Sequence, residues 1–104
     1  MQEWQIQYSE MSRRDLQTIK KYITYNLKSP NTAVKQINQI IKAIDNLSFF
    51  PKRSPIYKLE PWRSIGLRVL QINNYAVFYY PNVISHVVQV IRILYKKREF
   101  NTRL

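Results

Sequence analysis

The fold is decided by residues 66–95, which read GLRVLQI (66–72), NN (73–74), YAVFYY (75–80), PN (81–82) and VISHVVQVIRILY (83–95). Three of these runs are rich in β-branched and aromatic residues, which favour strands, and turn-forming residues separate them. Asn73-Asn74 tolerates the positive φ that a tight hairpin needs. Pro81 has no N–H to donate, so we expect it at the turn or just past the strand end. The stretch therefore predicts a three-stranded antiparallel meander.

The last of these runs is apolar on both sides. Strict alternation along a strand places two sets of side chains on opposite faces: Val88, Val90, Arg92 and Leu94 on one, and Val87, Gln89, Ile91, Ile93 and Tyr95 on the other. Both sets are largely apolar, so we expect a central strand with both sides at least partly covered.

The first half of the chain predicts a strand followed by two helices. Residues 4–8 alternate in polarity as a half-buried strand does. A first helix begins at Ser9 or Ser12, and Ser29-Pro30 is a start signal for a second helix, which Pro51 ends. Helical spacing predicts two core stripes: Leu16, Ile19, Ile23 and Leu27 in the first helix, and Ala33, Ile37, Ile40, Ile41, Ile44 and Leu47 in the second.

The order β-α-α-β-β-β indicates a single α+β domain over residues 1–104. The two helices are predicted to form a hairpin that covers one face of a four-stranded, mainly antiparallel sheet. We expect the first strand at an edge or beside the last strand. The other face is predicted to be concave, framed by Arg68, Arg92, the loop at Lys52-Arg53 and the C-terminal tail.

Composition narrows the classes of function. The single glycine excludes a glycine-rich phosphate loop, and the absence of cysteine excludes a disulfide framework and thiolate chemistry. One histidine, His86, and six acidic residues make a metal site or another cofactor unexpected, and His86 is predicted to be a surface or turn residue. We expect no signal peptide, because the start of the sequence lacks a basic region followed by an apolar one. We expect no membrane partner, because no apolar run approaches the roughly 20 residues of a membrane span. A cytoplasmic location is expected, and the absence of cysteine is compatible with it.

The net charge of +11 is unevenly distributed. Residues 1–45 contain seven basic and four acidic side chains, and residues 46–104 contain ten and two, which gives net charges of +3 and +8. This asymmetry predicts a polyanion or an acidic protein as partner of the second half; the alternative is a basic surface that only confers solubility. The candidate nucleic-acid-binding residues are Lys52, Arg53, Lys58, Arg63, Lys96 and Arg103.

Residues 49–63 mix basic and aromatic side chains, a combination that contacts phosphates and stacks on bases. For Phe49 and Phe50, however, we expect the rings to fill the edge of the core. Arginines, lysines and tyrosines suit RNA cleavage by the 2′-hydroxyl, with cations stabilising the phosphoryl oxygens and a tyrosine or lysine moving the proton. The same residues could equally bind phosphates without reaction.

The chain resembles the RelE/ParE superfamily of bacterial toxins from type II toxin–antitoxin modules. The resemblance rests on Tyr8-Ser9 before the first helix, Ser29-Pro30, residues 74–79 (NYAVFY) and residues 90–98 (VIRILYKKR). It implies a microbial RNase-like sheet with a helical hairpin, and an antitoxin with an acidic, partly apolar C-terminal segment as partner. RelE-like members enter the ribosome and cut mRNA, whereas ParE-like members poison DNA gyrase and are not nucleases.

The match to the nucleases is incomplete. They often carry an arginine where this chain has Ala76, and their tail tyrosine has no clear counterpart here. The resemblance matches family cations to Arg68 and to Lys97 or Arg98. On the basis of the one-sided basic face, the nuclease hypothesis assigns phosphate stabilisation to Arg68, Arg92, Lys97 and Arg98, and proton transfer to Tyr95 or a lysine. Because several of the phosphate-binding charges are present, we predict ribosome-dependent mRNA cleavage, with the ribosome and mRNA as partners. The alternatives are gyrase poisoning and a divergent, non-toxic nucleic-acid-binding protein.

Overall fold

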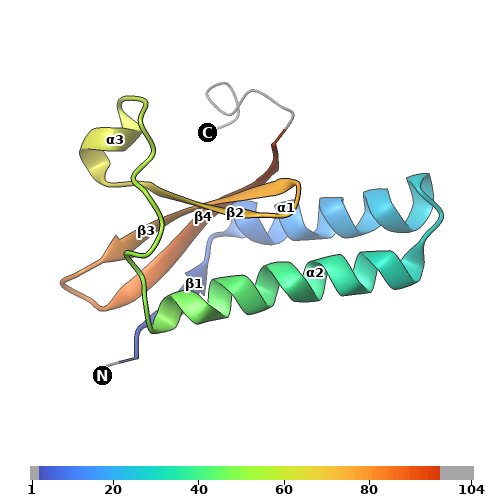
Figure 1. Cartoon of the computed structure of the whole chain (residues 1–104), viewed down its shortest axis with the longest axis horizontal. Helices are drawn as coiled ribbons and strands as arrows, with labels where there is room; N and C mark the ends of the chain where they lie inside the picture. Colours follow the sequence, from blue (N-terminus) through green and yellow to red (C-terminus); the bar gives the residue numbers. More distant parts are fainter. Residues whose placement is uncertain (1–2, 97–104) are drawn as a thin grey trace.

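The computed structural model describes residues 3–96. Its main elements are β1 (Gln5–Tyr8), α1 (Glu10–Lys21), α2 (Pro30–Asp45), the short α3 (Trp62–Ile65), β2 (Arg68–Ile72), β3 (Tyr75–Asn82) and β4 (Val87–Tyr95) (Figure 1). A π-helical turn, η1 (Tyr22–Asn26), follows α1, and a 3₁₀ turn, η2 (Asn46–Ser48), follows α2. Within residues 3–96, no helix combines the length and apolar character needed to cross a bilayer.

The four strands form one sheet in the order β1-β4-β3-β2. β2, β3 and β4 pair antiparallel, and β1 joins the edge parallel to β4. The turn between β2 and β3 places Asn73 at a φ of 52°, as the hairpin requires. The predicted meander, the edge position of β1 and the central position of β4 are all confirmed.

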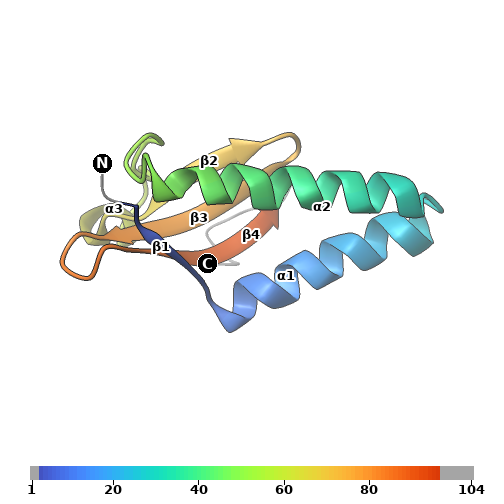
Figure 2. The same ribbon diagram turned by 90° about the horizontal axis from the view of Figure 1, so that it is seen from below.

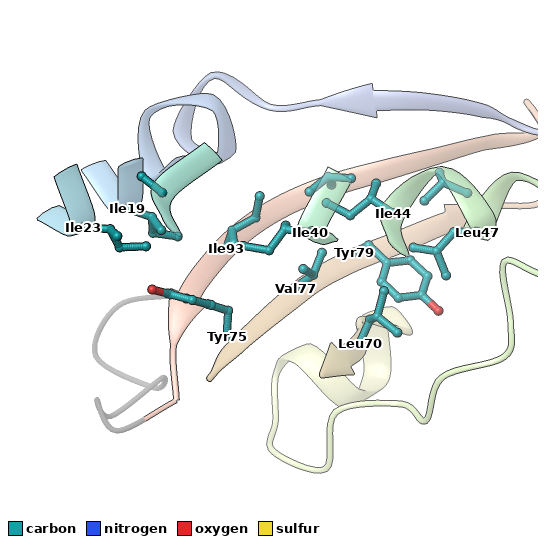
Figure 3. Packing of buried hydrophobic residues seen from close by; sticks show 13 residues of the cluster. Ile19, Ile23, Ile40, Ile44, Leu47, Leu70, Tyr75, Val77, Tyr79 and Ile93 are labelled. Carbon is teal, nitrogen blue, oxygen red and sulfur yellow. The ribbon is translucent and has the colours of Figure 1, made fainter. Parts of the chain in front are cut away.

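The helical hairpin covers one face of this sheet (Figure 2). α1 begins at Ser9, whose hydroxyl oxygen accepts a hydrogen bond from the backbone N–H of Ser12. Side chains from α2 meet those of the sheet in the main core, including Ile40, Ile44, Val77 and Tyr79, which are fully buried (Figure 3). The α+β architecture predicted from periodicity is thus the observed one.

The π-helical turn changes the apolar stripe of the first helix. The backbone N–H of Leu27 donates to the carbonyl of Tyr22, five residues earlier, at 3.3 Å. This wider turn rotates the following residues relative to a regular α-helix. Ile19 and Ile23 are buried as predicted, but Leu27 is 58% exposed, so its prediction as a core residue is wrong.

A β-bulge changes the faces of β4. Phe78 pairs with Arg92 but Tyr79 pairs with Val90, so Ile91 is an extra residue in the ladder. Val90 therefore faces the helices together with Ile93, rather than with Leu94 as alternation predicted. The prediction of one face shared by Val88, Val90, Arg92 and Leu94 is wrong for this reason.

Pro81 lies inside β3, not at the turn. It is buried and pairs with Val88, whereas the turn consists of residues 83–86. The β2–β3 pairing extends only to Tyr79, so β2 does not flank Pro81 and needs no N–H from it. The predicted position of Pro81 was therefore wrong by about two residues.

The opposite face of the sheet is also covered. Leu67, Ala76, Phe78 and Leu94 form a second buried cluster, and Tyr57 and Trp62 pack against it. The ring of Tyr57 meets that of Phe78 edge-on, with centroids 5.3 Å apart. The segment that contains α3 folds across this cluster (Figure 1), which confirms the expected coverage of β4 on both sides and leaves no concave surface over the cluster.

Candidate functional site

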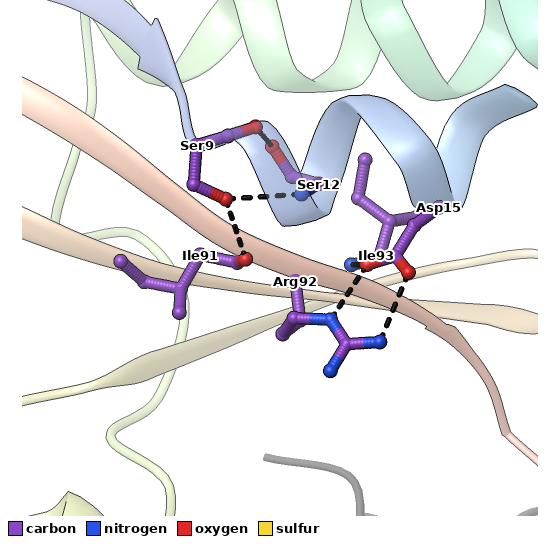
Figure 4. Close-up of polar contacts among 6 residues, drawn as sticks. All are labelled: Ser9, Ser12, Asp15, Ile91, Arg92 and Ile93. Atoms are coloured by element: carbon purple, nitrogen blue, oxygen red, sulfur yellow. Dashed lines mark hydrogen bonds and ion pairs between the residues drawn. The ribbon is translucent and has the colours of Figure 1, made fainter.

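The edge of β4 is completed by side chains of α1 rather than by a strand (Figure 4). β1 pairs with β4 only as far as Val90. Beyond that point the Ser9 hydroxyl donates to the carbonyl of Ile91 at 2.8 Å, and the Asp15 carboxylate accepts from the N–H of Ile93 at 2.9 Å. The Ile91 carbonyl and the Ile93 N–H, which lie beyond the end of the β1–β4 pairing, therefore both have hydrogen-bond partners.

Arg92 forms an ion pair with the same carboxylate. Its Nε and Nη2 lie 2.8 and 3.0 Å from the two Asp15 oxygens, and the side chains are only 12% and 11% exposed. The hydrogen bond to Asp15 raises the pKa of Arg92, and burial opposes this shift. A phosphate would have to compete with Asp15 for this guanidinium, so the structure gives Arg92 a structural role beside its predicted catalytic one.

Arg68 holds a loop in place. Its Nη1 donates to the carbonyls of Ser54 at 2.6 Å and Lys52 at 3.3 Å. It sits at the end of β2 that pairs with Tyr79, whereas Tyr95 pairs with Tyr75. Four residues of strand correspond to about 13 Å, so the structure does not bring Arg68 and Tyr95 together.

Tyr95 lines a cleft of about 630 Å³ between the helical hairpin and the ends of β3 and β4. Tyr22 and Tyr75 also line it, and the rings of Tyr75 and Tyr95 have centroids 5.6 Å apart. Burial raises the pKa of Tyr75, and Tyr95 and Tyr22 add to this effect. The cleft is therefore apolar and aromatic, with Asp15 on its wall already engaged by Arg92.

The other predicted cations are scattered. Lys52, Arg53, Lys58 and Arg63 are exposed on the segment between α2 and β2. The backbone N–H of Lys96 donates to the carbonyl of Asn74 at 2.9 Å, next to the β3–β4 pair Tyr75 and Tyr95. Lys97, Arg98 and Arg103 lie outside the described residues. Within residues 3–96, no three His, Cys, Asp or Glu side chains cluster as metal ligands would.

A second concavity, of about 570 Å³, lies at the far end of the sheet. It is lined by Trp4, Phe49, Phe50, Pro51, Lys52 and Arg53, and we call it the basic aromatic hollow. Phe49 and Phe50 are 48% and 57% exposed, so the prediction that they fill the edge of the core is wrong. His86, a turn residue as predicted, stacks on Trp4 with centroids 5.0 Å apart.

Comparison with protein families identifies the chain. Residues 6–100 match the family described as the ParE toxin of the type II toxin–antitoxin system parDE. The chain belongs to this ParE toxin family. The predicted membership of the RelE/ParE superfamily is confirmed, and the protein is a toxin of a type II toxin–antitoxin system. A comparison with curated proteins gives no match.

Solved structures agree with the fold. A chain of the chromosomal ParDE system from P. aeruginosa is 16% identical, with a TM-score of 0.74 over 88% of this chain and 95% of that one. A chain of the RelBE2 toxin–antitoxin complex from Mycobacterium tuberculosis is 17% identical, with a TM-score of 0.65 over 89% of this chain and 98% of that one. A chain of the archaeal RelE–RelB complex from Pyrococcus horikoshii is 16% identical, with a TM-score of 0.62 over 92% of this chain and 98% of that one. Both branches of the superfamily share this architecture.

Proposed function

We propose that this ParE-family toxin acts by binding DNA gyrase, and that it does not cut mRNA. The observation that carries the proposal is the burial of Ala76, which is 1% exposed within the second cluster. RelE-like nucleases often carry an arginine at this position. Here Tyr57 and Trp62 pack over the cluster, so the position faces protein and not a bound phosphate.

The spacing of the other candidates that lie within residues 3–96 supports the same conclusion. Cleavage by the 2′-hydroxyl needs cations at one phosphate and a proton-transfer group within hydrogen-bond reach of it. Arg92 is engaged with Asp15, Arg68 with two backbone carbonyls, and Tyr95 lies in the cleft near the opposite end of the strands. Poisoning by binding needs no such convergence, because its contacts can be spread over a surface.

We further propose that an antitoxin with an acidic, partly apolar segment neutralises this toxin in the cytoplasm. The net charge of +11 favours an acidic partner. Similar folds occur in the ParDE system and in RelBE complexes, as named above.

Two assays on the same preparation test the mechanism. The toxin, released from its antitoxin, is added to a gyrase supercoiling reaction and to a reconstituted translation reaction in which mRNA 5′ ends are mapped by primer extension. We expect lost supercoiling and intact mRNA. New 5′ ends within ribosome-occupied codons, with normal supercoiling, would establish cleavage and refute the proposal.

Tyr95→Phe is the matched variant for this comparison. It removes the hydroxyl that a nuclease would need and keeps the ring that lies beside Tyr75. If the toxin poisons gyrase, Tyr95→Phe should inhibit supercoiling as the unmodified protein does. A loss of toxicity in this variant, with the fold intact by circular dichroism, would instead favour proton transfer by Tyr95.

A further inference from the structure

The basic aromatic hollow combines features that neither the core nor the proposed mechanism requires. Phe49 and Phe50 expose about half of their surface next to Lys52 and Arg53, which are both exposed. Single exposed apolar residues are common, but a concave group of aromatic rings marks a binding site more often than chance. The hollow has a volume of about 570 Å³ and is open to solvent, so a ligand would lie along its surface rather than inside a closed cavity.

Backbone hydrogen bonds hold the walls of the hollow in place. The N–H of Trp4 donates to the carbonyl of Ser48 at 2.8 Å. This bond holds the backbone of Trp4 next to the start of the segment that carries Phe49 and Phe50. The N–H of Arg53 donates to the carbonyl of Phe50 at 3.2 Å and closes the turn that carries the two cations. The backbone that carries the rings and charges is therefore held in place before any ligand binds, which lowers the entropic cost of ordering the chain on binding.

The charges identify the kind of ligand. The hollow is lined by two cations and by no acidic residue; the nearest acid in sequence, Glu3, is exposed and does not line it. Aromatic faces beside lysine and arginine suit a ligand that carries flat rings on an anionic chain. A nucleic acid with unstacked bases meets this description, whereas duplex DNA hides its base faces.

We propose that the basic aromatic hollow binds single-stranded nucleic acid, with bases stacked on Phe49, Phe50 or Trp4 and phosphates paired with Lys52 and Arg53. The site is independent of the proposed gyrase mechanism. It requires no convergence with Arg92 or Tyr95, because it performs no reaction.

Fluorescence anisotropy of labelled oligonucleotides tests the proposal on the full-length toxin. Oligothymidylate and oligouridylate of 12 nucleotides are titrated with protein, without gyrase or ribosomes, so the result does not depend on the toxin's target. Comparison of the two distinguishes a DNA from an RNA ligand. Inorganic polyphosphate, which has charge but no bases, is the competitor that measures the purely electrostatic part.

Paired substitutions separate stacking from charge. Phe49→Ala with Phe50→Ala should weaken oligonucleotide binding about thirtyfold or more, because two base–aromatic stacks are lost and each is worth about fivefold or more. Lys52→Gln with Arg53→Gln should lower the slope of log K against log salt by about 1.4, or about 0.7 for each phosphate contact. The control, Lys20→Gln with Lys21→Gln, removes the same charge from α1 and should change affinity less than twofold.

Three outcomes would overturn the proposal. The unmodified toxin could fail to bind either oligonucleotide, in which case the hollow serves a protein partner or none. The aromatic pair could bind as tightly as the unmodified toxin, or polyphosphate could compete as well as an oligonucleotide of equal charge. Thermal unfolding of each variant checks that a lost affinity does not come from a lost fold.

Discussion

Replacement of Asp15 by alanine should strongly destabilise this toxin. The carboxylate accepts three hydrogen bonds, from Nε and Nη2 of Arg92 and from the N–H of Ile93, at 2.8, 3.0 and 2.9 Å. Asp15→Ala removes all three at once. It leaves a guanidinium that is 12% exposed without this counter-charge, and a strand N–H without this acceptor.

The expected cost follows from burial. Removal of one partner from a buried ion pair costs about 3–5 kcal/mol, because the remaining charge stays desolvated. Single domains are stable by only about 5–15 kcal/mol. At about 4 °C or more per kcal/mol for a chain of this size, the melting temperature should fall by at least about 12 °C.

The exposed pair on the same helix supplies the matched control. Arg14 and Glu10 lie 2.9 Å apart with side chains 68% and 78% exposed. Such pairs contribute about 0.3–0.5 kcal/mol, and an acidic side chain in the first turn of a helix adds about 0.3–1 kcal/mol, so Glu10→Ala should cost at most about 1.5 kcal/mol. Asp15→Leu combined with Arg92→Leu should be more stable than either single variant, because neither charge is then buried without the other.

Urea titrations followed by circular dichroism measure these differences at constant m-value. The reasoning fails if Asp15→Ala unfolds within about 1 kcal/mol of Glu10→Ala. It also fails if the double leucine variant loses the sum of the two single losses, since the two side chains would then act independently.

Three other substitutions test separate parts of the structure. Burial, together with the charge of Asp45, raises the pKa of Tyr8 to about 12. Between about pH 10 and pH 12 the folded state keeps a proton that the unfolded chain loses, so the free energy of unfolding should fall as pH rises through this range. In urea titrations, Tyr8→Phe should make this fall smaller. Gly66→Ala should cost about 1–2 kcal/mol in thermal unfolding, because the φ of +90° strains a side chain even though the nearest atom, on Tyr80, is 3.6 Å away. Ala76→Arg should unfold the protein, because it buries a charge in the second cluster. It should not produce mRNA cleavage that primer extension can detect.

The sequence predicted those parts of the fold that depend on neighbours within a few residues. The N-cap at Ser9, the helix start at Pro30 and the hairpin at Asn73 are all of this kind. It failed where one residue is inserted into a repeat. The bulge at Ile91 and the π-helical turn before Leu27 each shift the periodic pattern, and neither has a residue type that marks it.

The candidate site was harder to predict, because its contacts join distant residues. Arg92 and Asp15 are 77 positions apart, and charge alone gave no reason to pair them. Counting arginines therefore does not show which of them already have a partner within the protein. Similarly, Phe49 and Phe50 were expected to be buried, since nothing in the sequence placed them beside Trp4 at the rim of a hollow.

The coverage of both faces determines where partners can bind within residues 3–96. The helical hairpin covers one face, and the segment with Tyr57 and Trp62 covers much of the other. The two concave surfaces that remain lie at opposite ends of β4: the tyrosine cleft beside Tyr95, and the basic aromatic hollow beside the turn at His86. A toxin must bind both an antitoxin and a target. Because the tyrosine cleft and the basic aromatic hollow lie at separate ends of β4, each can bind a partner of different chemistry. The aromatic cleft suits apolar side chains, and the hollow suits anions that carry rings.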